Sequence, residues 1–527
     1  MSEKKSLIKK FKSHFDKDSQ VIENSFVYHG ESFSVFYLES LIDKKLFADS
    51  VLKEIETFVA NAQKNTANMS ENNDKNQQKM QNLAQVLKNE VVSVSSVTET
   101  LSVNEALTKL FSGNAIIVTE KSILICPVYG LQGRGVEEPP TSRVVKGPRE
   151  GFVEDLPKNI GLVRKRLKTS NLKIKDLFVG KQTHTQVSIL YLDGIAKQEI
   201  ISEVEKRIKN INIDGIIDSY YIESFLETDK IKFFRRVGNT EKPDVLCAKL
   251  LEGRVAVLVD GSPIALTVPF VMFEDLQSGE DYYTIPAKAT FVRLMRFCGL
   301  IFAILIPGIY VALQSFNYRI LPINFLITLL SSIEGLSVPP LIELLVVLFL
   351  FEIITEASLQ MPNSLGMALS IIGALALGNT AVDAGIISPP SIVIVAISSV
   401  ALYIIPDQIS ETRLLRILFT TIGGIIGLYG IVTAFIILTT YLTSISSFGV
   451  PYLAPLAPHI KQDRKDGFVV KPIQEMKTRP VLIVGENKTR QGDDDFSNEL
   501  LETEEDTENQ DKSQKNQKKS KEAQGDF

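Results

Sequence analysis

The fold is decided by residues 337–407, which read SVPPLIELLVVLFLFEIITEASLQMPNSLGMALSIIGALALGNTAVDAGIISPPSIVIVAISSVALYIIPD. This stretch is the centre of an apolar block that extends from Arg293 to Pro458. Acidic residues interrupt its aliphatic runs: Glu343, Glu352, Glu356 and Asp383. An ionised side chain costs at least about 2.5–3.5 kcal/mol in hydrocarbon, so such residues usually face a bundle interior or a water-filled path. The block predicts a membrane domain whose function depends on these acids.

Apolar runs on either side complete a predicted transmembrane domain over residues 291–458. An uncharged helical run of about 20 residues is long enough to cross about 30 Å of hydrocarbon. By this criterion we expect four spans, at about 297–316, 339–357, 389–405 and 414–442, and two short membrane helices, at 320–333 and 364–378. Pro307 and Gly308 predict a kink in the first span.

Basic residues flank this domain at both ends: Arg293 and Arg296 before the first span, and Lys461, Arg464, Lys465 and Lys471 after the last. Lys and Arg are enriched on the cytoplasmic side of membranes, so we expect both ends of the domain inside the cell. Ends on the same side require an even number of spans, which becomes six if the two short helices cross. Arg413 and Arg416 fit the rule poorly, since they precede a span that returns from outside.

The acids and the helix breaks are the candidate pore and gating residues: Glu343, Glu352, Glu356, Asn379, Asp383, Pro389 and Pro390. Successive helical residues are about 100° apart, so Glu352 and Glu356 share a face that can line an interior. Glu343 lies nearly opposite and needs another partner or a place near the membrane surface. Proline is tolerated in the first turn of a helix, so Pro339-Pro340 and Pro389-Pro390 are expected to open helices.

Small residues are the candidate helix-packing positions: Gly366, Ala374, Gly378, Gly385, Gly423 and Gly427. Small residues spaced four apart let helices approach closely in lipid. The polar break over 378–390 is expected to face a pore or a subunit interface, because irregular backbone at membrane depth needs protein or water around it. An ordinary loop at the membrane surface is the alternative interpretation.

The sequence before the membrane domain contains two similar segments. A shift of 154 residues aligns FSVFYLESL with VSILYLDGI, so that Ser34 falls on Ser188. Further along, FSGNAIIV resembles LEGRVAVLV, and each reads as a strand after a glycine turn. We predict two related α/β cytoplasmic subdomains, 25–131 and 172–290, unless two common strand–helix units match by chance.

The remaining segments are polar, with little to bury. They are a disordered N-terminus (1–24), an insertion (61–83), a connector (132–171) and a cytoplasmic tail (459–527) that is disordered from about 486. The connector carries a basic run that reads as a solvated helix face: Arg164, Lys165, Arg166 and Lys168. The predicted fold class is an α+β multidomain membrane protein, with two α/β cytoplasmic subdomains followed by an all-α multi-span membrane bundle.

Composition and motifs argue against an enzyme and against a nucleic-acid partner. Lys plus Arg total 57 and Asp plus Glu total 62, so no basic field favours nucleic acid. The three cysteines form neither a disulfide framework nor a zinc spacing, and the four histidines show no ligand spacing. We therefore expect no catalytic residues, no cofactor and no metal site.

Several motifs occur in a specific order along the chain. They are GPREGF (147–152), TEKPDV (240–245), LLEGRVAVLVDGSP (250–263), EDYY (280–283), SIIGALALG (370–378), AVDAGIISP (381–389) and FGVPYLAP (448–455), together with Glu352, Glu356-Ala357 and Pro362. In this order, over about residues 25–480, the chain resembles the A subunits of GerA-type spore germination receptors.

This resemblance implies a non-enzymatic protein that works in a complex in the inner membrane of a dormant spore. Its implied partners are a transporter-like B subunit that recognises the nutrient and a lipoprotein-like C subunit. It also implies a homo-oligomer of A subunits, surrounded by membrane lipid, that forms the germinant-gated ion-release channel. The alternatives are a secondary amino-acid transporter and a signal-relay scaffold that conducts no ions.

The chain departs from the family pattern at three positions where the family often has arginine: Ile333, Thr355 and Gln360. The absence of basic residues beside Glu352 and Glu356 argues against an intramembrane ion pair at that place.

Overall fold

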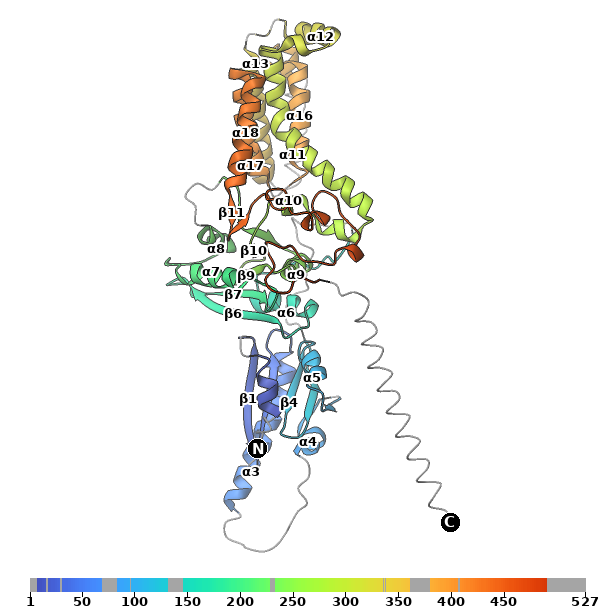
Figure 1. The fold of residues 1–527 in the computed structure, drawn as a ribbon. Coiled ribbons are helices and arrows are strands. Elements are labelled where there is room, and N and C mark those ends of the chain that lie inside the picture. Colours follow the sequence, from blue (N-terminus) through green and yellow to red (C-terminus); the bar gives the residue numbers. More distant parts are fainter. Residues whose placement is uncertain are drawn as a thin grey trace.

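The computed structural model describes residues 7–490 except 16–17, 29–30, 69–82, 95, 131–145, 228–232, 335, 337, 361–379 and 406–407. Three tiers follow one another along the long axis of the molecule (Figure 1). A first α/β subdomain is joined to a second, and the second supports a tier of long helices.

The first subdomain is a five-stranded antiparallel sheet with helices on both faces. Its strands are β1 (Val21–Tyr28), β2 (Glu31–Leu38), β3 (Thr98–Thr100), β4 (Asn114–Val118) and β5 (Ile123–Pro127), in the order β1-β2-β4-β5-β3. The alternation in β2 buries Phe33 and Val35 on one face and Phe36 and Leu38 on the other. One face packs on α2 (Lys44–Phe47), η1 (Ala48–Leu52), α3 (Lys53–Asn68), α4 (Leu83–Val86) and η2 (Leu87–Val91). The other face packs on α1 (Leu7–Lys12) and α5 (Val103–Leu110).

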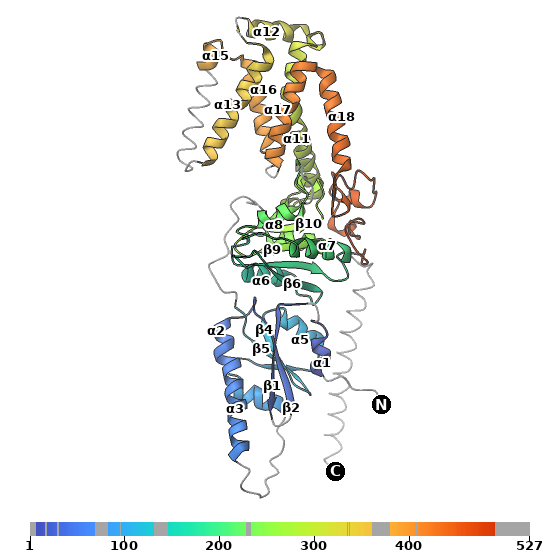
Figure 2. The ribbon, with the colours of Figure 1, turned by 90° about the vertical axis from the view of Figure 1, so that its left-hand side faces the viewer.

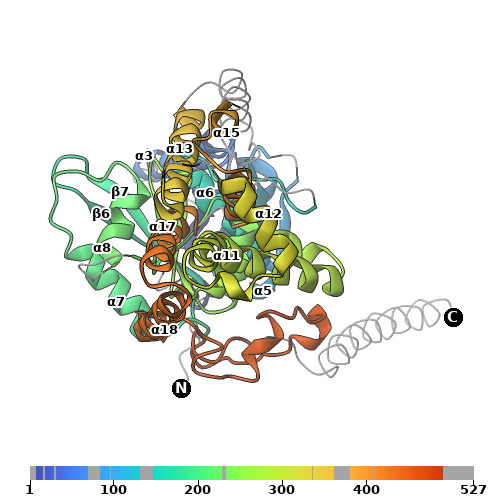
Figure 3. The same cartoon turned by 90° about the horizontal axis from the view of Figure 1, so that it is seen from above.

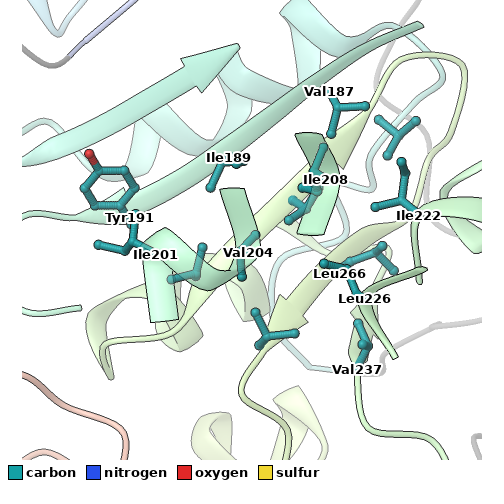
Figure 4. Close-up of a cluster of buried hydrophobic side chains, with 14 of the residues drawn as sticks. Val187, Ile189, Tyr191, Ile201, Val204, Ile208, Ile222, Leu226, Val237 and Leu266 are labelled. Atoms are coloured by element: carbon teal, nitrogen blue, oxygen red, sulfur yellow. The ribbon is translucent and has the colours of Figure 1, made fainter. Parts of the chain in front are cut away.

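The second subdomain repeats this design. Its strands are β6 (Leu172–Val179), β7 (Thr185–Leu192), β8 (Gly238–Thr240), β9 (Val255–Val259) and β10 (Ala265–Val268), in the order β6-β7-β9-β10-β8. One face packs on α7 (Gln198–Lys209) and α8 (Ser219–Leu226), where Val204 of α7 lies against the strands (Figure 4). The other face packs on α6 (Leu156–Arg166) and α9 (Pro243–Leu251). The common strand order confirms the prediction of two related subdomains.

Two boundaries of these subdomains differ from the prediction. The segment 1–24 is not a disordered N-terminus throughout, because α1 buries Phe11 completely and β1 already begins at Val21. The connector is shorter than predicted, because the amphipathic helix α6 packs under the second sheet. The predicted solvated face of α6 is also wrong at one position, since Arg164 is fully buried and its Nη2 lies 2.5 Å from Asp18 Oδ2.

The polar insertion and the tail also differ from the prediction. Residues 61–68 continue α3, and 69–82 lie outside the described residues. Residues 459–490 pack on the second subdomain, where the Gly485 N–H donates to Ile195 O at 2.7 Å. This segment includes η7 (Asp463–Lys465) and η8 (Ile473–Glu475), and the structure describes it as far as residue 490, close to the predicted boundary at about 486.

The third tier begins after two short elements, α10 (Phe273–Leu276) and η3 (Gly279–Tyr283). Its helices are α11 (Pro286–Ser315), η4 (Tyr318–Ile320), α12 (Ile323–Ile333), α13 (Pro340–Gln360), α15 (Ala381–Asp383), α16 (Pro389–Leu402), α17 (Ile409–Ile426) and α18 (Leu428–Ser444). Seen from above, α11 lies among α13, α17 and α18 (Figure 3). α12 lies across the end farthest from the sheets (Figure 2). Within the described residues, α11 is the one helix long and apolar enough to cross a bilayer, while α16 and α18 are apolar but shorter.

The predicted span 414–442 is two helices rather than one. Gly427 adopts φ +77° between α17 and α18, a conformation that suits glycine and ends the first helix. The two helices form a hairpin, so two antiparallel helices replace the one continuous helix that was predicted here (Figure 2). Predicted helix starts at Pro340 and Pro389 are confirmed. The predicted short helix 364–378 lies outside the described residues.

Both ends of the helical tier return to the second subdomain. α11 follows η3 directly, and α18 leads into the small hairpin of β11 (Ser446–Ser447) and β12 (Val450–Pro451). The Phe270 N–H donates to Ser447 Oγ at 2.9 Å, which attaches this hairpin to the chain after β10. The two ends therefore lie on one side of the tier.

Glycines allow a close backbone contact between α11 and α17, and they form two turns. A Cβ on Gly423 of α17 would lie 2.5 Å from Gly308 O of α11, so these backbones touch. Gly427 forms the hairpin turn. Gly385 has φ +64° and no described residue within 4 Å of a Cβ, so it serves a turn. Three other predicted packing positions lie outside the described residues: Gly366, Ala374 and Gly378.

Candidate functional site

A charged network inside the helical tier joins four helices. Glu352 of α13 accepts from Arg416 of α17, and its second oxygen lies 3.1 Å from Arg413 Nε. Arg416 Nη1 also donates to Ser399 Oγ of α16 at 3.1 Å. Ser398 Oγ, on the same helix, donates to Ala303 O of α11 at 2.8 Å. The network therefore connects α11, α13, α16 and α17 through side chains that an apolar bundle rarely contains.

The burial of Arg416 makes this network important for stability, because a buried charge without a partner is costly. The Arg416 side chain is 1% exposed, whereas Arg413 is 20% and Glu352 22% exposed. A buried guanidinium is tolerated only with a paired carboxylate and further hydrogen bonds. The prediction that argued against an ion pair at Glu352 is therefore wrong: the partners come from α17, not from neighbouring positions of α13. The available signal was two cations, three residues apart, at the start of an apolar run.

Glu343 lies in a separate buried site. It is 2% exposed, and its Oε1 accepts from both the N–H and the Oγ of Ser388, each at 2.7 Å. Ser388 is the N-cap residue of α16, and its Oγ lies 2.9 Å from Ser391 Oγ, which can donate to it. A carboxylate is favourable at a helix N-terminus, where backbone N–H groups lack partners. Glu343 thus caps α16 from α13, which gives the predicted unmatched acid its partner.

The other candidate pore residues have different environments. Glu356 is exposed and accepts from Gln360 Nε2 at 2.8 Å, so it does not join Glu352 in a buried pair. Asp383 is exposed at the far end of the tier, next to the turn at Gly385. Pro389 and Pro390 occupy the first turn of α16. Asn379 lies outside the described residues.

A second charged cluster attaches α11 to the tier below. Arg293 is fully buried, and its Nη1 donates to Asp466 Oδ1 at 3.0 Å and to Gly467 O at 2.7 Å. Its Nη2 lies 3.2 Å from Asp281 Oδ2. Arg296 Nη1 donates to the same carboxylate at 2.9 Å. These arginines, predicted as charges that flank the first span, also link α11, η3 and the C-terminal segment.

A third cluster lies beneath it in the second subdomain. Glu274 of α10 lies 2.8 Å from Lys249 Nζ and accepts from Arg254. Asp275, the next residue, accepts from Gln408 Nε2 at 2.7 Å, which ties α10 to the loop between α16 and α17. α10 therefore provides a direct contact between the loop joining α16 to α17 and the second subdomain.

We expect the Glu274 cluster to make folding sensitive to acid. Burial opposes ionisation of Glu274, yet Arg254 and Lys249 lower its pKa from 4.5. A lowered folded pKa contributes stability above the unfolded value, and that contribution is lost as the pH falls through the folded value. Thermal unfolding followed by circular dichroism should show that acidification below about pH 4.5 destabilises the protein. The thermal stability of Glu274→Gln should fall less on acidification than that of Glu54→Gln, a control at an exposed position. An equal fall in both variants would contradict this assignment.

The described residues contain no group of three or more His, Cys, Asp or Glu side chains arranged to hold a metal ion. Cys126 and Cys247 are buried, and burial raises the pKa of each thiol to about 12. Thiols in that state are poor nucleophiles. The chemistry that these clusters support is charge pairing and mechanical linkage between helices.

Comparison with known proteins identifies relatives along nearly the whole chain. The family model for the Bacillus/Clostridium GerA spore germination protein matches residues 9–482. Spore germination protein KA of Bacillus subtilis (strain 168) is 33% identical over 465 residues, which cover 88% of this chain and 82% of that protein. The uncharacterized membrane protein YfkQ of the same organism is 34% identical over 450 residues, covering 85% of this chain and 84% of that protein.

A crystal structure of the N-terminal domain of the A subunit of the Bacillus megaterium spore germinant receptor GerK3 is 26% identical to this chain. It aligns with a TM-score of 0.36 and covers 50% of this chain and 94% of that domain. With the family match extending over residues 9–482, the chain belongs to the GerA family of spore germination proteins.

Proposed function

We propose that this protein is the A subunit of a nutrient germinant receptor in the spore inner membrane. In this proposal it assembles with itself, with a transporter-like B subunit and with a lipoprotein C subunit. The assembled A subunits form the ion-release channel that opens when a nutrient binds. Membership of the GerA family supports the role in germination.

The observation that carries the proposal of a channel is the charged network around Glu352. Its ion pairs and hydrogen bonds link four helices of an apolar tier. Charged groups buried in a membrane bundle are costly, and they usually mark ion pathways or the elements that move around them. Because Asp275 connects α10 to the loop between α16 and α17, the same helices are linked to the subdomain below.

The surface of α13 supplies a candidate pore-facing stripe. Side chains three and four residues apart are exposed along one side of this helix: Ile342, Val346, Phe349, Ile353 and Glu356. Such residues share a helix face. In the proposed oligomer this face meets neighbouring subunits and places Glu356 toward the ion path, close to the end nearer the sheets. One Glu356 from each subunit would form a ring of carboxylates there, and such a ring favours the passage of cations over anions.

Glu356→Gln is expected to alter ion conductance without preventing folding. The substitution removes one negative charge per subunit from an exposed position, so the cation current should fall severalfold. The measurement is the single-channel current of the purified protein in a planar bilayer, which also distinguishes a channel from a transporter or a relay scaffold. Glu54→Gln makes the same charge change in the first subdomain and should leave the current unchanged. Identical currents in both variants, or no current from the wild-type protein, would refute the pore assignment.

We also propose that both α/β subdomains and the C-terminal segment lie in the cytoplasm, while η4 and α12 lie at the opposite membrane surface. In intact cells, an impermeant maleimide should then label Arg319→Cys from outside but neither Lys10→Cys nor Lys488→Cys. All three side chains are exposed in the chain. After the membrane is permeabilised, the two protected positions should label. External labelling of Lys10→Cys would overturn this orientation.

A further inference from the structure

A pocket of about 290 Å³ lies where the helical tier meets the second subdomain. It combines basic and apolar side chains from residues 456–471, at the start of the C-terminal segment and just before it: Lys461, Arg464, Lys465, Lys471, Leu456 and Val469. None of the described residues that line it is acidic. The structural role assigned to the C-terminal segment, which is to attach α11, does not use these side chains.

The pocket lies at the level where the apolar part of α11 begins. Its Phe468 packs edge-on against Phe297 of α11, with 4.8 Å between ring centroids, and against Phe273 of α10 at 4.9 Å. Phe297 follows Arg296 and is the first residue of the uncharged run of α11. The C-terminal segment lies beside the foot of the helices at this level, on one side of the tier (Figures 1 and 3). If the tier spans a membrane as proposed, this pocket lies at the cytoplasmic membrane surface.

Two cations of the pocket are available for a ligand. The side chains of Lys461 and Arg464 are exposed and bind no other side chain among the residues that the structure describes. Lys471 pairs with Glu475 at 2.7 Å, an exposed contact that is worth little. The nearby acids are engaged elsewhere: Asp463 accepts from the Val481 N–H at 3.0 Å and Asp466 binds Arg293. The pocket therefore presents net positive charge.

We propose that this pocket binds the phosphate headgroup of an anionic phospholipid of the surrounding membrane. The cations contact the phosphate, while the exposed side chains of Leu456 and Val469 contact the start of the acyl chains. Clusters of four or more basic residues directly beside a membrane helix attract anionic lipid. A free phosphate ion would need the cations alone, whereas a lipid also uses the apolar side chains. The inference rests on the proposed membrane insertion.

The test uses the full-length protein in nanodiscs of phosphatidylcholine, with and without phosphatidylglycerol. Native mass spectrometry after release measures how many phosphatidylglycerol molecules each protein retains. Lys461→Gln/Arg464→Gln removes the two unpaired cations. Lys488→Gln/Arg490→Gln makes the same charge change on exposed residues of the same segment, outside the pocket. Each juxtamembrane cation removed should weaken retention roughly fivefold, and the pair about 30-fold, whereas the control should bind as the wild-type protein does.

Val469→Ser distinguishes a phospholipid headgroup from a free phosphate ion as the ligand of the pocket. Loss of this exposed apolar contact should weaken retention of phosphatidylglycerol, and added inorganic phosphate should not displace the lipid. Equal retention by the pocket and control variants, or displacement by inorganic phosphate, would overturn the lipid site. Failure of the wild-type protein to enter phosphatidylcholine nanodiscs would overturn the membrane proposal on which it rests. Entry without a preference for phosphatidylglycerol would overturn the lipid site alone.

Discussion

Replacing Glu352 with glutamine should destabilise the protein by about 3–5 kcal/mol, because it leaves Arg416 buried without a carboxylate. Arg416 is almost completely buried, and its remaining partners are neutral serine hydroxyls. The measurement is the unfolding free energy of the full-length protein in one detergent. Glu356→Gln is the matched control on the same helix, and its exposed side chain predicts little change. Equal stability of the two variants would show that the pair does not hold the bundle together.

A second substitution separates the cost of an unpaired charge from the value of the pair. Glu352→Leu combined with Arg416→Met removes both members, so no unpaired guanidinium remains at this position. Replacing a buried ion pair with apolar residues is often neutral or stabilising, so the double variant should recover most of the stability lost by Glu352→Gln. Arg413 can still reach solvent, since its side chain is 20% exposed. A double variant that is less stable than Glu352→Gln would mean that the network carries more than charge compensation.

Arg293→Met should detach the C-terminal segment from the foot of α11, with a cost of about 3–5 kcal/mol. The substitution leaves Asp466 without its guanidinium partner and removes donors from Gly467 O and Asp281. Limited proteolysis should then cut residues 459–490 faster than in the wild-type protein. Since the segment links α11 to the second subdomain, we also expect weaker germination of spores that carry this variant.

Lys288→Met is the matched control for Arg293→Met. Lys288 lies in the same helix, carries the same charge and is exposed. Its loss should leave both the proteolysis rate and the unfolding free energy unchanged within about 0.5 kcal/mol, as is usual for surface substitutions. If Arg293→Met is cut no faster than Lys288→Met, the cluster does not anchor the segment.

The sequence by itself determined the two related subdomains and several helix starts. Strand alternation has a period of two, so Phe33 and Val35 mark one face of β2 whatever packs against it. The match of Ser34 with Ser188 carried over to the same strand order in both sheets. Prolines mark helix starts for a local reason, because their missing N–H has no partner in the first turn. Such properties depend on neighbours along the chain, and the sequence displays them directly.

Only the tertiary structure decided how the charges are paired. Periodicity correctly placed Glu343 and Glu352 on different faces of α13. The helical period does not show which residue of another helix each face contacts. Glu352 meets Arg416 from a helix 64 residues further along the chain, and Glu343 meets Ser388 after 45 residues. The sequence did not reveal the turn at Gly427 either, because one long apolar run is compatible with a single helix and with a helical hairpin. Long-range pairing arises from packing in three dimensions, where the cost of an unpaired buried charge selects the arrangement that neutralises it.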